Sequence, residues 1–292
     1  WQRQFVMPDA SRLNEMRCIT KSRFMTTNQP SSELLDVGHM TYLNSEVFYR
    51  KLPTNSCRLH PMPPRAMAAA VEEGELQAGP LPIAEVMRLG ETVKSLGNLG
   101  VACEGEARSV FLFSHLPVEE LSGKKIAVTS HTATSIQLLR LLFADHWNVT
   151  GHEFVEMSDD HDAALVIGDP ALEMLNRGDF DHHNDLGGAW NSLTGLPFVF
   201  AEWVIRSDTD QLLSDELELR LVQATRDGLE SIPEIQQART SNRMSAEHVS
   251  NYVLNFTYFL GEKEREGQRE FEHRLKRLPQ WRPTVLTPTA AV

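Results

Sequence analysis

The segment DLGGAWNSLTGLPFVFAEWVIR (residues 185–206) gives the clearest indication of the fold class. A tight turn of Gly195, Leu196 and Pro197 is followed by a nearly unbroken apolar run that ends at Glu202 and Trp203. A short apolar run bounded by turn residues is typical of a strand that is covered on both faces, as in α/β proteins. The sequence therefore predicts a helix or loop and then a long buried strand.

Composition and charge limit the kinds of molecule that the chain is expected to bind. The chain has 292 residues, 41% of them hydrophobic, which is enough for a core and for two lobes. Lys and Arg total 28 and Asp and Glu total 40, so the net charge is −12. An acidic protein is poorly suited to bind nucleic acid or an anionic membrane through non-specific electrostatics. We therefore expect no nucleic-acid or membrane partner, whereas a small anionic ligand is compatible with this charge because a local pocket can be positive inside an acidic protein.

The three cysteines favour a reducing compartment. Cys18, Cys57 and Cys103 are odd in number, lie far apart and form no CxxC pair. No apolar stretch approaches the roughly 20 residues that span a bilayer, and the N-terminus lacks the apolar region of a signal peptide. We expect a cytoplasmic protein. The chain starts at Trp1. One hypothesis is that an upstream segment has been removed, and another is that Met25 is the natural start and residues 1–24 are extraneous.

Strands and helices alternate along the chain, which indicates α/β layers. Strands are expected at 36–44, 108–114 and 162–169, and helices at 65–76, at 131–147 and throughout the region beyond 211. Residues 1–35 are expected to be a loosely ordered tail. Residues 36–116 and 206–292 are expected to form one lobe, and residues 117–205 an inserted second lobe. A cleft between two lobes is a common ligand site.

The sequence TSHTATSIQLL places several hydroxyl groups at the start of the helix expected at 131–147. The first N–H groups of a helix are unpaired and carry the positive end of its dipole, so they bind carboxylate or phosphate. Thr132, Ala133, Thr134 and Ser135 are therefore candidates for an anion site. The alternative is a plain helix cap, which needs only one of the hydroxyl groups.

Other polar residues have a structural as well as a functional interpretation. Asp169 follows a strand end, where functional residues of open sheets often lie, but it could simply cap the next helix. His39 is a candidate acid or base and Asn44 a candidate amide ligand, although either could be an ordinary edge residue. The stretch DFDHHNDLG (179–187) carries metal-binding side chains, but no HExxH or HxxxH pattern supports them. A solvated polar loop is favoured there, and no metal is expected.

Six segments together resemble one family, the chorismate dehydratases of the futalosine route to menaquinone. The resemblance runs from about Val37 to Arg206 and is weaker in the helical C-terminal third. TGLPFVFA is the most specific of the motifs. In order, the segments are VGHMTYLN, EEGELQAGPL, CEGEARSVFLFS, PVEELSGKKIAVTSHTATSIQLL, DAALVIGDPAL and DLGGAWNSLTGLPFVFAEW.

The resemblance implies a fold like that of type II periplasmic binding proteins, with two α/β lobes around a central cleft and a helical C-terminal segment. It also implies a lyase that removes water from the dicarboxylate chorismate to give 3-(1-carboxyvinyloxy)benzoate. This reaction ends in an aromatic ring, so no cofactor and no metal are expected. The enzyme must mainly hold the two carboxylates, align the reacting groups and exclude water.

Matching positions suggest the site. Asn44 corresponds to the Asn of the family's LN motif and is expected to orient the reacting part of the substrate. Ser109 and residues 132–135 correspond to positions expected to bind carboxylate. Motif positions at the lobe junction, with less defined roles in binding substrate, are Asp169, Asp185, Gly195, Leu196 and Pro197. For the base there are two hypotheses, the enolpyruvyl carboxylate of the substrate itself and His39.

Two departures from the family put the substrate in question. Glu46 and Val47 stand where the family usually has a Pro, and a carboxylate there would repel an anion unless it points away. Pro82 stands where the family usually has Ser or Thr, which removes one hydroxyl contact. Two alternatives follow: a non-catalytic binding protein of the same fold for a small anionic metabolite, and the sister naphthoate-ring synthase of the same pathway.

Overall fold

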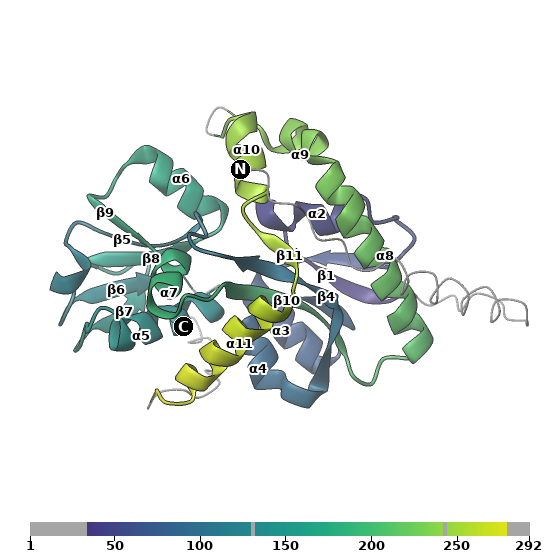
Figure 1. Cartoon of the computed structure of the whole chain (residues 1–292), viewed down its shortest axis with the longest axis horizontal. Coiled ribbons are helices and arrows are strands. Elements are labelled where there is room, and N and C mark those ends of the chain that lie inside the picture. Colours follow the sequence, from purple (N-terminus) through teal and green to yellow (C-terminus); the bar gives the residue numbers. More distant parts are fainter. Residues whose placement is uncertain (1–33, 130–131, 242–243, 279–292) are drawn as a thin grey trace, which may run out of the picture. The chain divides into compact units, whose positions relative to one another are not determined.

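The computed structural model of the chain describes residues 34–129, 132–241 and 244–278. Within these ranges the chain forms two β-sheets with helices around them, in the α/β class that the sequence predicts (Figure 1). The expected tail over residues 1–35 lies, apart from its last two residues, outside the described ranges. The hypothesis about Met25 also concerns residues outside them.

Three separate parts of the chain build a six-stranded mixed sheet. Its strands are β1 (Asp36–His39), β2 (Arg58–Pro61), β3 (Ala78–Pro82), β4 (Val93–Cys103), β10 (Phe198–Arg206) and β11 (Thr257–Phe259). Strand β1 pairs parallel with β2 and β3, whereas β10 pairs antiparallel with β3 and β4. The order across the sheet is β11-β4-β10-β3-β1-β2, so β10 lies between two neighbours that precede it by about a hundred residues in the sequence.

Strand β10 is the apolar run after the Gly-Leu-Pro turn, and its burial explains its composition. Only Phe200 and Arg206 of the strand are partly exposed. Its one buried charge, Glu202, is 3% exposed. The Glu202 carboxylate accepts hydrogen bonds from Arg265 Nη1 at 2.7 Å and from Gln268 Nε2 at 3.1 Å, both on α11 (Glu262–Leu275). A buried charge is tolerated because it is paired in this way.

One continuous stretch of chain supplies the five-stranded sheet. Its strands are β5 (Val110–Ser114), β6 (Lys125–Val128), β7 (Glu153–Glu156), β8 (Ala163–Ile167) and β9 (His182–Asp185), in the order β7-β6-β8-β5-β9. Strand β5 pairs with β8 and β9, although the sequence places residues 36–116 in the first lobe. The division into lobes stays a prediction, and we propose to move its first boundary to the N-terminal side of β5.

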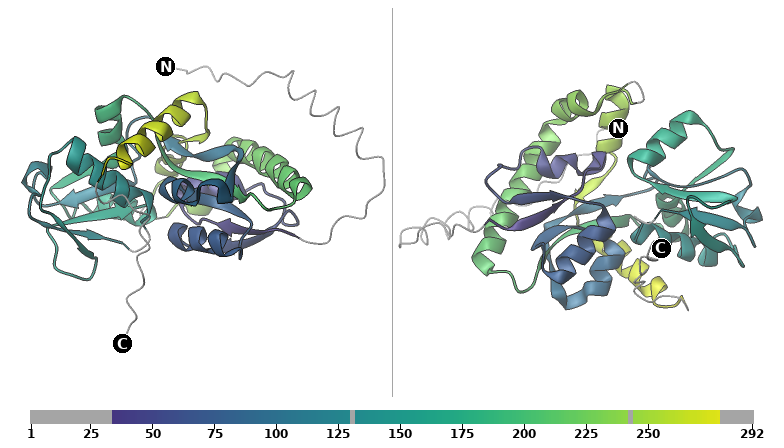
Figure 2. Two further views of the ribbon diagram at one scale, coloured as in Figure 1. Left: turned by 90° about the horizontal axis from the view of Figure 1, so that it is seen from below. Right: turned by 180° about the vertical axis from the view of Figure 1, so that it is seen from behind.

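Helices cover both sheets, and α8 runs along the six-stranded sheet beside α2 (Figures 1 and 2). The helix expected at 65–76 is α3, which ends at Gly74 in the left-handed conformation with φ 82°. Besides α11, the α-helices of the described residues are α2 (Glu46–Tyr49), α3 (Pro64–Glu73), α4 (Ile83–Leu89), α5 (Thr134–Asp145), α6 (Asp169–Arg177), α7 (Leu186–Thr194), α8 (Gln211–Glu230), α9 (Ile232–Arg239) and α10 (Ala246–Val253). A short 3₁₀ turn, η1 (Leu43–Ser45), precedes α2.

Three expectations about elements are wrong. The stretch expected as a polar loop at 179–187 contains β9, because its backbone pairs with β5 at the sheet edge. The region beyond 211, expected to be helical, contains β11, whose aromatic and β-branched residues pair with the exposed edge of β4. The strand expected at 36–44 ends at His39, so Asn44 lies in the turn η1 and not at a strand end.

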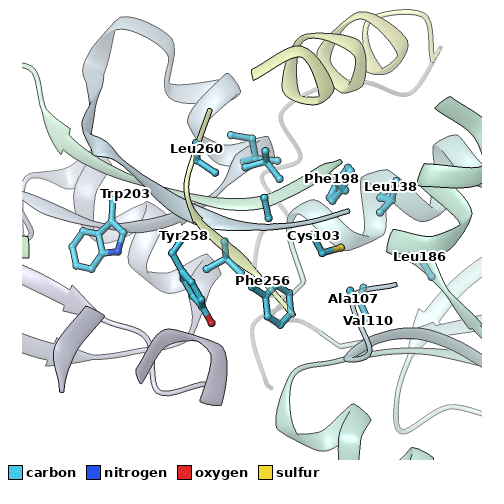
Figure 3. Packing of buried hydrophobic residues seen from close by; sticks show 14 of the residues in the cluster. Cys103, Ala107, Val110, Leu138, Leu186, Phe198, Trp203, Phe256, Tyr258 and Leu260 are labelled. Atoms are coloured by element: carbon cyan, nitrogen blue, oxygen red, sulfur yellow. The ribbon is translucent and has the colours of Figure 1, made fainter. Parts of the chain in front are cut away.

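The main hydrophobic core extends along β4, β10 and β11 to the start of β5 (Figure 3). Trp203 and Phe198 of β10 are almost completely buried, and Phe198 makes edge-to-face ring contacts with Trp190 and Phe271. The ring of Trp203 packs edge-on against Phe48 of α2. This packing fixes the strands on which the pocket residues lie.

Candidate active site

Residues of both sheets and of the adjoining helix starts line one pocket. The space free of protein atoms measures about 610 Å³, counting the open mouth of the pocket. One part of the wall is polar and includes Asn44, Ser109 and Ser135. Other parts are apolar and include Pro82 and Phe256. Among the described residues, no charged side chain belongs to this lining.

The first turn of α5 reaches this pocket with its backbone N–H groups uncapped. The helix begins at Thr134, and Ala133, which has no polar side chain, occupies the N-cap position, so among the described residues no side-chain cap is found. The alternative interpretation, a plain cap by Thr132, Thr134 or Ser135, is wrong, because Ala133 is the N-cap residue. Thr134 Oγ1 instead accepts from the Ala84 N–H at 3.1 Å. An uncapped helix start in a neutral pocket is suited to hold a carboxylate.

Thr132 shapes the approach to the helix. It is buried, and its hydroxyl donates to the Thr129 carbonyl at 2.9 Å. Among the residues that the structure describes, the pocket lining includes Ala133, Thr134 and Ser135 but does not include Thr132. Thr132 therefore acts on the pocket through the backbone of the turn.

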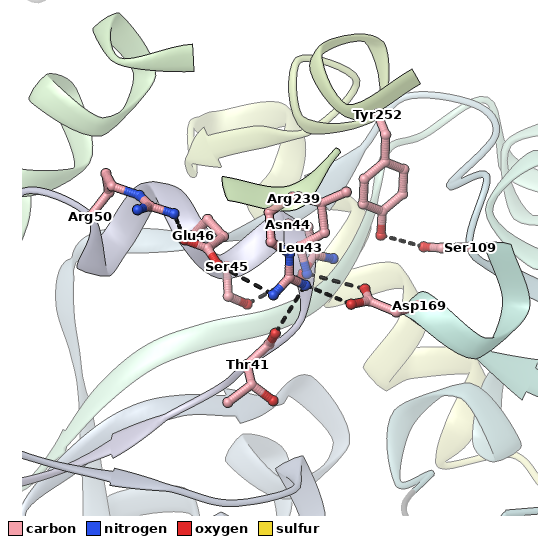
Figure 4. A network of polar contacts seen from close by, with 10 residues as sticks. All are labelled: Thr41, Leu43, Asn44, Ser45, Glu46, Arg50, Ser109, Asp169, Arg239 and Tyr252. Atoms are coloured by element: carbon pink, nitrogen blue, oxygen red, sulfur yellow. Dashed lines mark hydrogen bonds and ion pairs between the residues drawn. The ribbon is translucent and has the colours of Figure 1, made fainter. Parts of the chain in front are cut away.

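Asn44 and Ser109 face the same pocket from different elements. Asn44 lies in η1, where its Oδ1 accepts from Ser45 Oγ at 3.3 Å. Ser109 precedes β5 and is 2% exposed. The Tyr252 hydroxyl of α10 donates to Ser109 Oγ at 2.7 Å (Figure 4). No sequence motif singles out Tyr252, because it occupies an apolar position of an ordinary amphipathic helix.

His39 ends β1 beside the ring of Tyr49, with the ring centroids 4.3 Å apart. Burial lowers the pKa of His39, although the nearby Glu46 carboxylate opposes this shift. Within the described part of the chain, the residues that line the pocket do not include His39.

Asp169 joins α6 to the turn that carries Asn44. Its Oδ1 accepts from the Leu43 N–H at 3.2 Å, and its Oδ2 pairs with Arg239 Nη2 at 2.6 Å (Figure 4). The N-cap of α6 is Gly168, so Asp169 does not cap this helix. Burial raises the pKa of Asp169, while the Leu43 N–H and Arg239 lower it in part.

Glu46 points into the same ion-pair network. Its Oε2 pairs with Arg50 at 2.6 Å, and its Oε1 lies 3.4 Å from Arg239 Nη1. Two arginines thus lie beside the Glu46 carboxylate. Pro82, in contrast, belongs to the pocket wall and presents no hydroxyl there.

Asp185, the last residue of β9, links the start of α7 to the backbone that precedes β5. It caps α7 by accepting from the Gly188 N–H at 2.9 Å. It also accepts from the N–H groups of Ala107 at 2.9 Å and Arg108 at 2.7 Å. Burial raises the pKa of Asp185, and these three N–H donors oppose the shift. Among the described residues, Asp185 is not part of the pocket lining.

The Gly-Leu-Pro turn also has a structural environment. Gly195 ends α7 in the left-handed conformation, with φ 71°. The Leu196 carbonyl accepts from Asn191 Nδ2 at 3.2 Å, and the Pro197 carbonyl accepts from Trp190 Nε1 at 3.1 Å. None of these three turn residues is among the described residues that line the pocket.

No group of three or more His, Cys, Asp or Glu side chains that could hold a metal ion occurs among the described residues. Nor does that part of the chain contain a helix long and apolar enough to cross a membrane.

A sequence profile described as menaquinone biosynthesis matches residues 35–277, which is well over half of the chain. The chain belongs to this menaquinone biosynthesis family. The family match covers every residue of the pocket lining described above. Among curated proteins, the chain is 29% identical to the chorismate dehydratase of Thermus thermophilus over 201 residues, which are 62% of this chain and 72% of that protein.

Solved structures similar to this family member support the fold. A protein of Archaeoglobus fulgidus has a TM-score of 0.68 at 15% identity, covering 85% of this chain and 98% of that one. The periplasmic aliphatic sulphonate-binding protein of Escherichia coli has a TM-score of 0.55 at 14% identity, covering 85% and 93%. The two mixed sheets therefore form a fold like that of periplasmic binding proteins, which confirms the expected fold.

Proposed function

We propose that this chain is a chorismate dehydratase of the futalosine route to menaquinone. The observation that carries the proposal is the pocket, where the uncapped start of α5 shares a wall with Asn44 and Ser109. An arrangement of neutral donors suits a carboxylate ligand, since a carboxylate only accepts hydrogen bonds. Membership of the menaquinone biosynthesis family and the similarity to a curated chorismate dehydratase support the same substrate.

The proposed reaction removes one proton and one hydroxide from the cyclohexadiene ring of chorismate. The proton leaves the ring carbon that carries the ether, where conjugation with the ring carboxylate acidifies it. The hydroxyl on the adjacent carbon leaves as water, and the ring becomes aromatic. Because the product is so stable, the protein needs mainly to hold and align the substrate and to exclude water.

The roles of the pocket residues follow from their chemistry. The N–H groups at the start of α5, with Thr134, Ser135 and Ser109, hold a carboxylate, and the amide of Asn44 orients the reacting ring. The described residues of the lining include neither a carboxylate nor an imidazole. We therefore favour the enolpyruvyl carboxylate of the substrate as the base over His39. Asp169, Asp185 and the Gly195 turn support the site through the backbone.

The test is to incubate the purified protein with chorismate and to separate the products by chromatography with mass detection. We expect a product lighter by one water with an aromatic absorbance. Asn44→Ala should lower kcat/KM by roughly 100-fold, as for the loss of one aligned donor. Asn251→Ala, an exposed position on α10, is the control and should behave like wild type. No product from wild type, or full activity in Asn44→Ala, would contradict the proposal.

A second candidate is a binding protein that performs no chemistry. It is favoured by Pro82, which removes a hydroxyl contact from the pocket, and by the likeness in fold to a sulphonate-binding protein. The same experiment separates the two, because a binding protein would retain chorismate unchanged. Calorimetry with chorismate would then show saturable binding without release of product.

A further inference from the structure

A pair of buried hydroxyl groups lies at the polar wall of the pocket. Tyr252 is 4% exposed and Ser109 is 2% exposed, and their oxygens are 2.7 Å apart. Tyr252 lies on α10, whereas Ser109 immediately precedes β5 of the five-stranded sheet. Of this pair, Ser109 belongs to the described pocket lining and Tyr252 does not. Tyr252 therefore reaches a ligand through Ser109.

In this hydrogen bond the Tyr252 hydroxyl is the donor and Ser109 Oγ is the acceptor. Burial raises the pKa of Tyr252, so its phenol stays protonated and can donate. The Ser109 backbone is itself held, because its carbonyl accepts from the Gly168 N–H at 2.8 Å. When Ser109 Oγ accepts from Tyr252, its own hydrogen is left to point elsewhere, and the open direction is the pocket.

We propose that Tyr252 is a positioning residue that makes Ser109 a hydrogen-bond donor toward the ligand and so selects a carboxylate. This inference rests on the proposed function for its natural substrate. A carboxylate oxygen can only accept, whereas a carboxamide presents both a donor and an acceptor. A serine that is committed to donating therefore favours the first over the second. Acceptance from the phenol also polarises the serine and strengthens its donation.

Removing the phenol oxygen changes one atom and leaves the ring in the core. In Tyr252→Phe, Ser109 is free to rotate and to donate to other acceptors. We expect kcat/KM for chorismate to fall about tenfold. Ser109→Ala should cost at least as much, and the double variant should equal Ser109→Ala, because Tyr252 acts through Ser109.

A matched control lies in the same core. Tyr258 of β11 is 2% exposed, and its hydroxyl donates to the Val253 carbonyl at 2.9 Å. Tyr258→Phe therefore also removes one buried phenol hydrogen bond, but one that is not linked to Ser109. The melting temperature should fall by a similar amount in both Phe variants. Only Tyr252→Phe should lose activity, which separates positioning from general loss of stability.

A binding measurement keeps this inference separate from the proposed reaction. The affinities of benzoate and of its isostere benzamide are measured by NMR titration of the wild type and of each variant. We expect the wild type to prefer benzoate and Tyr252→Phe to lose most of that preference, with Tyr258→Phe unchanged. This result can hold even if chorismate is not converted, in which case only the proposed function fails.

Three results would overturn the inference. The first is a wild type that does not prefer benzoate over benzamide. The second is a Tyr252→Phe variant with the wild-type preference and activity. The third is a double variant whose losses multiply those of the single variants, because Tyr252 would then act independently of Ser109.

Discussion

Gly267 of α11 leaves no room for a side chain. An ideal Cβ at this position would lie 2.1 Å from the Pro197 carbonyl oxygen. A Gly→Ala change inside a helix usually stabilises a protein by up to about 1 kcal/mol. Here the contact should reverse the sign, because α11 must move away from the turn. We expect Gly267→Ala to lower the free energy of unfolding by about 1–3 kcal/mol.

Urea denaturation followed by circular dichroism measures this change. Glu266→Ala, an exposed position on the same helix, is the control and should change the free energy of unfolding by less than about 0.5 kcal/mol. A Gly267→Ala protein as stable as the wild type would mean that α11 packs less closely on the turn at Pro197 than the structure shows.

Individual residues show how far the site could be predicted. Asn44, Ser109 and residues 133–135 lie in the pocket lining, and their roles stay predictions. Asp185 and Pro197 stand out in the same sequence motifs, but their polar atoms serve capping and turn contacts. A motif marks a position that is constrained. Sequence alone does not tell whether packing or a ligand imposes the constraint. Tyr252 and Arg239 give no local signal, because their partners lie over 60 residues away.

At the level of elements, the edge of the six-stranded sheet carries a charge cluster. Asp36 of β1 pairs with Arg58 and His60 of β2 at 2.6 and 2.7 Å. The hydrogen bond from Arg58 lowers the pKa of Asp36 to about 2 from an ordinary value of 3.8. A lowered pKa means that the pair stabilises the fold above pH 3.8 and that this stability is lost as the pH falls toward 2.

Asp36→Asn should therefore destabilise the protein by about 1 kcal/mol at pH 7, a figure already reduced for solvent screening. At pH 2 the difference between the variant and the wild type should become much smaller, because half of the wild-type carboxyl groups are then protonated. Thermal unfolding at both pH values tests this, with the exposed Asp160→Asn as the control. An equal difference at pH 7 and pH 2 would show that the ion pairs do not supply the stability.

Elements with a strong local signal were predicted well. Helix α3 has helix-forming residues and a glycine at its end, and β10 has a turn and a continuous apolar run. Strands β9 and β11 have only four and three residues, and their pairing is decided by a neighbouring strand. Such edge strands are held by backbone hydrogen bonds with distant parts of the chain, which a local pattern does not reveal.

On the scale of the whole described chain, Arg239 links segments that belong to different sheets. It pairs with Asp169, which follows β8 of the five-stranded sheet, and lies near Glu46, which follows β1 of the other. Its removal would leave two carboxylates facing each other and would loosen the turn that carries Asn44. We expect Arg239→Ala to lower kcat/KM for chorismate about tenfold.

Arg177→Ala is the matched control, because Arg177 pairs with Asp179 on the surface, where a salt bridge contributes little. Steady-state kinetics of both variants, with a melting curve for each, separate loss of function from loss of fold. If Arg239→Ala and Arg177→Ala had the same kcat/KM, the ion pairs across the sheets would have no part in arranging Asn44.

The position of β10 between β3 and β4 also sets an order of events during synthesis on the ribosome. The five-stranded sheet is complete once residue 185 has emerged, since all of its strands come from one stretch. Strands β3 and β4 emerge earlier but have no mutual pairing, and must wait for β10 to enter between them. The edges of β3 and β4 that pair with β10 therefore stay unpaired until residue 206 has emerged, and the other edge of β4 waits for β11. Such edges are the part of this chain most prone to aggregate before folding is finished.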